Sequence, residues 1–359
     1  MKKLPQTVGI IGGGQLGRMM IPHIKQLGLS VVVLDPDPNC PCSAISDHIV
    51  AGFNDEAGFR ELAKKSDVIT YEFEHINVPL LKIIEKEGAV IFPSVSSLEI
   101  IQDKYTQKKA LQEKGIPVPK MGLDMKPPFM LKSRMGGYDG KGNYVVRTDA
   151  EMEKAAEKFS AIGQTSWFME ELVDFEREVS VIATRGQDGK MVVYPICENV
   201  HSDSILDTTT VPATISSKSM EEKIFKVARD VLECFQGVGT FCAELFITKK
   251  GEVLVNEVAP RVHNSGHYTI EAVRTSQFEN HIRAICGLPL GSTELLVPFA
   301  VMKNIIGPFS LDAVYKVLEN AGTSLHLYGK EVAKPGRKMG HITVTGEKEH
   351  VQGVVKQIG

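Results

Sequence analysis

The sequence predicts a multidomain α/β and α+β protein with a parallel-sheet domain at the N-terminus, a small lid and a strand-rich C-terminal portion. The first hundred residues alternate short apolar runs with helical patterns, which is typical of a parallel sheet covered on both faces. Residues 176–258 are mostly strand-like, with one long helical pattern. A chain of 359 residues exceeds one simple core, so two or three domains are expected.

The bulk composition excludes several classes of protein. A net charge of −3 offers no polyanion-binding surface, so nucleic acid is not an expected partner. No apolar stretch approaches the ~20 residues needed to cross a bilayer, and no secretory signal precedes Val8. The six cysteines are scattered and lack zinc spacing, so we expect reduced thiols, no membrane partner and a cytoplasmic location.

The N-terminal domain is expected over residues 1–99. A strand at 8–11 leads into Gly12-x-Gly14-x-x-Gly17, a helix follows, and the next strand closes on Asp35. This spacing fits a dinucleotide fingerprint, whose glycines allow phosphate to approach a helix N-terminus. Alone it favours an NAD-dependent dehydrogenase, but it also occurs in Rossmann-like domains that bind no nucleotide. Further strands are expected at 67–71 and 89–92.

The second segment, 100–179, is expected to carry the lid. A helical pattern over 96–115 ends at Gly115-Ile-Pro-Val-Pro119, and strands at 129–132 and 143–147 flank the glycine-rich loop 136–142. Lys132 ends the first of these strands, where its mobile charge suits phosphoryl oxygens. The loop offers backbone N–H groups to a phosphate chain, although a plain hairpin turn is the alternative.

The strongest chemical signal lies in the third segment, 180–295, where 244–257 is predicted to be a β-hairpin turning at Lys250-Gly251. With a loop of two or four residues, Glu244 faces Glu257, Phe246 faces Val255 and Thr248 faces Val253. Two facing carboxylates ~5 Å apart repel unless a cation lies between them, and magnesium suits oxygen ligands. Asn256 adds an amide oxygen if the strand bulges there. The alternative is two solvated glutamates on an exposed sheet face.

Other polar clusters are weaker signals. The segment Arg261–His267 follows the hairpin directly and suggests anion or substrate capture, or else a solvated loop. Glu170–Val173 ends a strand and Glu178 follows, a pattern able to hold adenine and ribose. In the last segment, 296–359, Lys330 and 334–338 form a cluster that can grip phosphate, or a charged surface turn.

Six motifs together carry a family resemblance. They are Gly12-Gly-Gly-Gln-Leu-Gly-Arg18, Gln102-Asp-Lys-Tyr-Thr-Gln-Lys108, Gly136-Gly-Tyr-Asp-Gly-Lys-Gly142, Asn256-Glu-Val-Ala-Pro-Arg-Val-His-Asn-Ser-Gly-His267, Ser276-Gln-Phe-Glu-Asn280 and Lys334-Pro-Gly-Arg-Lys-Met-Gly-His341. This set resembles the ATP-grasp superfamily and, within it, the 5-(carboxyamino)imidazole ribonucleotide synthetases of the PurK type. It spans residues 9 to about 344.

The resemblance implies an ATP-grasp fold with a Rossmann-like pre-ATP-grasp domain, and an ATP- and Mg²⁺-dependent carbon–nitrogen ligase. Its implied substrates are 5-aminoimidazole ribonucleotide and bicarbonate, joined through carboxyphosphate in de novo purine biosynthesis. A homodimer is implied, and NAD is not expected. The segment 120–128 is shorter than family members usually carry, so the lid should lack a helix there.

The resemblance also implies a role for individual residues. Those implied to hold ATP are Lys104, Lys132, Gly137, Tyr138, Asp139, Gly140, Lys141, Gly142, Asn143, Glu170, Glu171, Leu172, Val173, Glu178, His201, Asn256 and Glu257. Magnesium falls to Glu244 and Glu257. Those implied to hold the ribonucleotide are Gln15, Leu16, Glu74, Tyr138, Asp139, Arg261, His263, Asn264, Lys330 and Arg337. Asp139, Arg261 and Lys330 are the candidates for catalysis.

Three alternatives stay open from the sequence alone. The first is a sibling ATP-grasp ligase that uses another acid, such as a formate-dependent glycinamide ribonucleotide transformylase. The second is an NAD-dependent oxidoreductase, and the third is a nucleotide-sensing protein without turnover.

Overall fold

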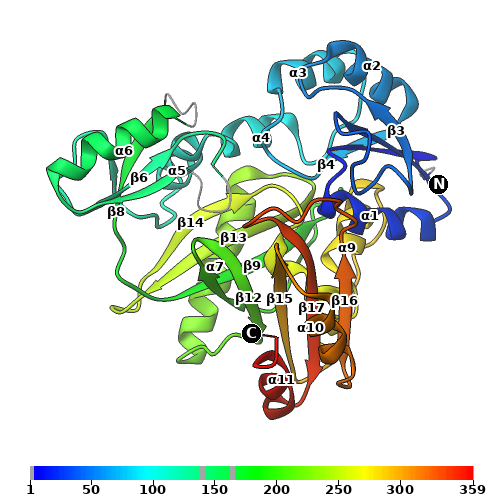
Figure 1. The fold of residues 1–359 in the computed structure, drawn as a ribbon. Helices are drawn as coiled ribbons and strands as arrows, with labels where there is room; N and C mark the ends of the chain where they lie inside the picture. Colours follow the sequence, from blue (N-terminus) through cyan, green and yellow to red (C-terminus); the bar gives the residue numbers. More distant parts are fainter. Residues whose placement is uncertain (1–3, 138–141, 162–165, 359) are drawn as a thin grey trace.

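The structure is a computed structural model that describes residues 4–137, 142–161 and 166–358. Figure 1 shows the N-terminal domain on one side, the lid on the other, and a large sheet below and between them. The C-terminal strands continue that large sheet. Within the described residues, no helix combines the length and the apolar character that a bilayer crossing requires.

The N-terminal domain is built on a four-stranded parallel sheet of order β3-β2-β1-β4. The elements are β1 (Thr7–Ile11), α1 (Gln15–Gln26), β2 (Ser30–Asp35), β3 (Asp47–Val50), α2 (Glu56–Lys65), β4 (Val68–Tyr71) and α3 (Val78–Lys86). Separate apolar clusters pack against its two faces, one with α1 and one with α2 and α3. The parallel sheet covered on both faces is therefore confirmed. The strand predicted at 89–92 is wrong: only a single bridge joins Ile91 to Ile69.

The lid is a second four-stranded sheet, of order β5-β8-β6-β7, with α6 packed against it. Its elements are β5 (Met121–Gly122), β6 (Phe129–Ser133), β7 (Asn143–Val146), α6 (Asp149–Ala161) and β8 (Trp167–Glu171). Two helices precede it, α4 (Val95–Ile101) and α5 (Lys104–Glu113), and their apolar residues pack in the cores of the N-terminal domain and the large sheet. The single helix predicted over 96–115 is two helices, because the Asp103 carboxylate caps α5 by accepting the N–H groups of Tyr105 and Thr106. The fully described segment 120–128 contains β5 and no helix, as predicted.

The large sheet contains nine strands in the order β14-β13-β9-β11-β12-β15-β17-β16, with β10 beside β9. Its elements are β9 (Phe175–Arg185), β10 (Met191–Val193), β11 (Cys197–Ser202), β12 (Ile205–Val211), α7 (Lys218–Phe235), β13 (Gly239–Thr248), β14 (Val253–Ala259), η1 (Asn264–Gly266), α8 (Thr269–Ala272), α9 (Gln277–Ile285), β15 (Phe299–Ile306), α10 (Leu311–Leu318), β16 (Thr323–Leu327), β17 (Lys338–Gly346) and α11 (Lys348–Val355). The α7 helix buries its apolar face against β9, β13 and β14.

One expectation for this part is corrected and one is confirmed. The helix predicted over 270–284 is split into α8 and α9, because the Ser276 hydroxyl caps α9 by accepting the Glu279 N–H. The C-terminal portion is strand-rich, as predicted, with β15, β16 and β17, and it also carries α10 and α11. It packs α11 against β15 and β17, so the tail is an α/β layer on the edge of the large sheet.

Candidate active site

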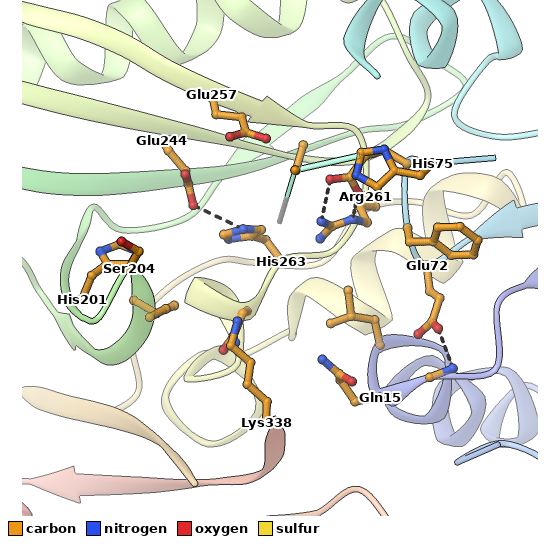
Figure 2. Close-up of a pocket in the computed structure, with 18 of the residues that line it drawn as sticks. Gln15, Glu72, His75, His201, Ser204, Glu244, Glu257, Arg261, His263 and Lys338 are labelled. Carbon is orange, nitrogen blue, oxygen red and sulfur yellow. Dashed lines mark hydrogen bonds and ion pairs between the residues drawn. The ribbon is translucent and has the colours of Figure 1, made fainter. Parts of the chain in front are cut away.

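One cavity of about 790 Å³ opens where the N-terminal domain, the lid and the large sheet meet. Figure 2 shows carboxylates, imidazoles and basic groups that line it from several elements. The predicted positions on its wall are Gln15, Leu16, Glu74, Lys104, Lys132, Gly137, Asn143, Glu178, His201, Glu244, Asn256, Glu257, Arg261, His263, Asn264, Lys330 and Arg337. Predicted site residues that lie as far apart in the sequence as Gln15 and Arg337 therefore line the same cavity.

A few predicted residues do not line this wall. Gly142 and the segment 170–173 are absent from the lining, and Glu170 is buried behind it. Tyr138, Asp139, Gly140 and Lys141 lie outside the described residues.

The hairpin of β13 and β14 brings the two predicted metal ligands together. Glu244 pairs directly with Glu257, as predicted. The other predicted pairs are wrong, since Phe246 faces Leu254 and Thr248 lies opposite Glu252 across a three-residue turn. The register shifts by one residue at Asn256. This β-bulge restores the pairing of the two glutamates and places Asn256 on the cavity wall beside Glu257.

Negative charge accumulates at this hairpin. Burial, and then the neighbouring carboxylates of Glu178 and Glu257, raise the pKa of Glu244 to about 7. Lys104 neutralises part of this negative charge, because its ammonium lies 2.9 Å from Glu257 Oε2. The imidazole of His201 lies 3.3 Å from Glu178 Oε2. A group of carboxylates that resists full ionisation is an attractive place for a cation.

His263 faces the same hairpin as a neutral imidazole. Burial, and then the nearby Arg261 charge, lower its pKa to about 3. The backbone N–H of Ser265 donates to His263 Nδ1 at 3.3 Å, so the ring proton belongs on Nε2. That nitrogen lies 3.3 Å from Glu244 Oε1. Gln277 holds the backbone of His263 through both its N–H and its carbonyl, which fixes the ring in place.

Lys132 occupies the lid side of the cavity. Its ammonium lies 2.6 Å from Glu170 Oε1 and donates to Asn256 Oδ1 at 2.9 Å, so it joins the lid to the hairpin of β13 and β14. The second oxygen of Glu170 accepts from the buried ammonium of Lys108. Burial alone would raise the pKa of Glu170, but the two lysines lower it.

Arg261 is oriented by Glu74 across the domain boundary. Its Nε and Nη2 atoms donate to the two oxygens of Glu74 at 2.6 and 3.1 Å, a bidentate pair. Burial opposes ionisation of Glu74, yet the guanidinium lowers its pKa to about 2. The pair links the turn after β4 to the segment after β14 and fixes both at the cavity.

The glycine fingerprint is closed by the chain's own carboxylates. Glu72 Oε1 and Oε2 accept the N–H groups of Gly14 and Gly17 at 2.5 and 2.8 Å, and Asp35 accepts the N–H of Gly13 at 2.8 Å. Figure 2 shows the Glu72 carboxylate directed at the start of α1. The groups that would bind a dinucleotide pyrophosphate are therefore already satisfied.

A basic pole closes the far end of the cavity. Lys330, Arg337 and Lys338 from the C-terminal portion line it. Lys330 donates to the backbone carbonyl of Lys338 at 2.7 Å, which ties the two segments together. Asn264 lines the same cavity, and within the described residues neither amide atom of its buried side chain has a hydrogen-bond partner. Such buried polar atoms point to a ligand that completes them.

Comparison with known proteins agrees with this geometry. Three family models match in succession: the ribonucleotide synthetase preATP-grasp domain over residues 5–102, the ATP-grasp domain over 97–278 and the phosphoribosylaminoimidazole carboxylase C-terminal domain over 300–352. The chain is 41% identical to the N5-carboxyaminoimidazole ribonucleotide synthase of Bacillus subtilis (strain 168), over 96% of this chain and 92% of that protein. The chain belongs to the N5-carboxyaminoimidazole ribonucleotide synthase family.

Solved structures of this family superpose on the whole chain. A crystal structure of an ADP complex of purK has a TM-score of 0.92 at 41% identity and covers 99% of this chain and 97% of its own. The Aspergillus clavatus synthase in complex with ADP and 5-aminoimidazole ribonucleotide has a TM-score of 0.88 at 35% identity, with 98% of each chain covered. The ATP-grasp fold of this family, predicted from the motifs, is thereby confirmed.

Several residues that matter at the cavity of this synthase-family chain were not predicted from the sequence. Glu72 follows β4 two positions before Glu74, which was the only available signal for it. Lys108 stands among other helix charges, and its burial could not be read from its neighbours. Phe175 and Phe246 stack with ring centroids 4.7 Å apart on the cavity wall, a pairing that requires the register of β9 and β13.

Proposed function

We propose that the chain catalyses the ATP-dependent carboxylation of the amine of 5-aminoimidazole ribonucleotide with bicarbonate. The products are 5-(carboxyamino)imidazole ribonucleotide, ADP and phosphate, a step of de novo purine biosynthesis. One observation carries this proposal: the opposed pair Glu244 and Glu257 shares a single cavity with Lys132 and with the basic pole at Lys330. A nucleotide and a second phosphorylated substrate can thus meet.

The cavity divides into two binding regions in this proposal. ATP lies between the lid and the hairpin, where Lys132, Lys104 and Asn256 face its phosphates and Glu178 and His201 lie near its ribose. The apolar stack of Phe175 and Phe246 is placed for the adenine ring. The ribonucleotide lies toward the N-terminal domain, where its phosphate meets the pole of Lys330, Arg337 and Lys338, and Gln15, Leu16 and Asn264 contact the rest.

The donors at the hairpin fit magnesium. Glu244, Glu257 and Asn256 offer hard oxygen atoms from neighbouring backbone positions, and the charge of the clustered carboxylates is only partly answered by Lys104. The described residues contain no cluster of three or more acidic, histidine or cysteine ligands. The facing pair Glu244 and Glu257 suits Mg²⁺, which uses one or two protein carboxylates together with substrate phosphates. When bound, the ion would neutralise charge on the transferring phosphoryl group.

The reaction balances in two steps. A bicarbonate oxygen bonds to the γ-phosphorus of ATP, the bond to the β,γ-bridging oxygen breaks, and ADP leaves with carboxyphosphate formed. The amine nitrogen then bonds to the carboxyl carbon, phosphate leaves, and the nitrogen gives up one proton. Lys132 and Lys104 stabilise the developing charge on the phosphoryl group. Arg261, whose guanidinium is oriented by Glu74, holds the bicarbonate. Asp139, outside the described residues, stays our candidate for orienting the amine or taking its proton.

The resemblance also leads us to propose a cytoplasmic homodimer with no nucleic-acid or membrane partner. Sedimentation equilibrium at several protein concentrations tests the dimer. A single species of about 39.4 kDa throughout would rule it out.

The function is tested by coupled ADP release with the ribonucleotide present, with and without bicarbonate. We expect turnover only with both substrates and ATP. Turnover with formate in place of bicarbonate would instead indicate a sibling ligase, and ATP binding without turnover on any acceptor would indicate a sensor. Tight NADH binding without ATPase activity would return the assignment to an oxidoreductase.

A further inference from the structure

A buried cluster of three charges lies behind the phosphate side of the cavity. Lys108 of α5, Glu170 of β8 and Lys132 of β6 are 1%, 2% and 7% exposed. Each carboxylate oxygen of Glu170 pairs with one of the two ammonium groups. Lys132 lines the cavity, whereas Lys108 does not. Nothing in the proposed reaction uses Lys108, so its burial beside a second lysine needs a physical reason.

The charges in this cluster do not balance when all three groups are ionised. Two cations share one carboxylate, and an excess buried charge is unfavourable unless something compensates it. Among the described residues, the carboxylate of Glu257 on β14 also acts on Lys108, but Glu257 is already paired with Lys104. Burial, and then the Lys132 ammonium, lower the pKa of Lys108 to about 7 despite the opposing effect of Glu170. Within residues 4–137, 142–161 and 166–358, no further carboxylate pairs with this cluster, and an anion on the cavity side of Lys132 would supply the compensation.

We propose that Lys108 is a positioning residue whose protonation frees Lys132 for the phosphates of the nucleotide. With Lys108 neutral, Lys132 and Glu170 form a one-to-one ion pair. The Glu170 carboxylate of the lid then neutralises the charge of Lys132. An arriving polyphosphate supplies negative charge, Lys108 takes up a proton from solvent, and its ammonium then neutralises Glu170. Lys132 keeps its contact with Asn256 and turns its charge to the phosphates. This inference rests on the proposed ATP binding and adds a proton to it.

The test is calorimetric titration with ADP and Mg²⁺ in paired buffers of different ionisation enthalpy. At about pH 8 we expect the wild-type chain to take up a proton on binding, and its affinity to fall by up to about tenfold per pH unit above pH 7. Lys108→Met should bind ADP roughly tenfold more weakly than wild type at about pH 6.5, and it should take up no proton on binding at about pH 8. Lys108→Arg, which stays charged, should bind like wild type at low pH and hold that affinity as pH rises.

Lys109→Met is the matched control, because Lys109 is the next residue of α5 and is exposed. It should behave as wild type in every titration. Adenosine is the second control, since it lacks phosphates and should bind wild type and Lys108→Met equally. Equal weakening of adenosine and ADP would show a merely structural role and overturn the proposal.

The titration of the wild-type chain is also decisive by itself, so the proposal can be tested even if a variant does not fold. ADP binding without proton uptake at about pH 8 overturns the role of Lys108 and leaves the proposed function standing. Absence of any ADP binding overturns both. Proton uptake that persists in Lys108→Arg would assign the proton to a different group and would likewise refute the proposal.

Discussion

Two regions of this molecule carry the residue types that bind phosphate, and the structure treats them in opposite ways. The glycine turn before α1 presents backbone N–H groups, and Glu72 and Asp35 already accept them at 2.5–2.8 Å. The hairpin of β13 and β14 presents Glu244 and Glu257, whose partners are the side chains of Lys104 and His263 on the cavity wall. In the first region, carboxylates of the chain satisfy the N–H groups that could bind phosphate. In the second region, the carboxylates face the cavity, where a ligand can reach them.

The difference lies in which molecule supplies the countercharge. At the glycine turn a carboxylate stands where a phosphate would bind, so the region stabilises the fold and needs no ligand. At the hairpin, among the described residues, Glu244 and Glu257 have one cationic partner, Lys104, and burial raises the pKa of Glu244. A ligand is expected at the site whose charges the protein itself does not neutralise. Residue types alone do not separate the two cases.

The comparison is tested most strongly by Glu257→Gln. The amide keeps the size of the side chain but removes the charge that a cation requires, so we expect turnover to fall by at least ~100-fold with the melting temperature unchanged. Coupled ADP release and thermal unfolding measure the two quantities. Glu252→Gln, exposed in the same hairpin, is the control. Full activity in Glu257→Gln would remove the metal assignment.

Glu72→Gln tests the closed region. The amide nitrogen cannot accept an N–H bond, so one donor of the pair Gly14 and Gly17 is left unsatisfied. We expect a loss of about 2 kcal/mol in the free energy of unfolding, measured by urea denaturation, with ADP affinity retained. Glu85→Gln changes an exposed carboxylate of the same domain and should be neutral. A variant as stable as wild type would mean that Glu72 is not the countercharge of this turn.

Arg261→Lys tests the link between the two regions. Lysine keeps the charge but loses the bidentate contact with Glu74, so the bicarbonate and the ribonucleotide bind more weakly. We expect KM for the ribonucleotide to rise roughly tenfold while KM for ATP changes little. Arg274→Lys, at an exposed position, is the control. Equal changes in both KM values would place Arg261 in the nucleotide site instead.

Much of the fold followed from the sequence because its signals are local. Short apolar strands with helices between them predict a parallel sheet, and β1, β2 and β4 lie where they were expected. The errors also have local causes. Asp103 and Ser276 cap new helices inside stretches that look continuously helical, so α4–α5 and α8–α9 appear as single helices in a periodicity pattern.

The site was predicted less completely because its geometry depends on contacts between distant segments. Glu244 faces Glu257 as expected, yet the turn has three residues and the bulge at Asn256 compensates for it. Two errors of register therefore cancelled at the glutamates and remained at Phe246. Glu72 and Lys108 could not be assigned, since their roles come from partners 55 to 62 positions away.

Gly251→Ala tests the three-residue turn with the smallest expected effect. Gly251 has φ +75°, a left-handed conformation that alanine adopts with strain, and its N–H donates to the Thr248 carbonyl at 2.9 Å. We expect the variant to lose about 1 kcal/mol of unfolding free energy with turnover retained. Gly353→Ala, inside α11 with no atom near the added methyl group, should be neutral or stabilising, the opposite sign. Should Gly251→Ala also stabilise the chain, the turn would not need a left-handed residue, and the bulge at Asn256 would lose its explanation as the compensation for a three-residue loop.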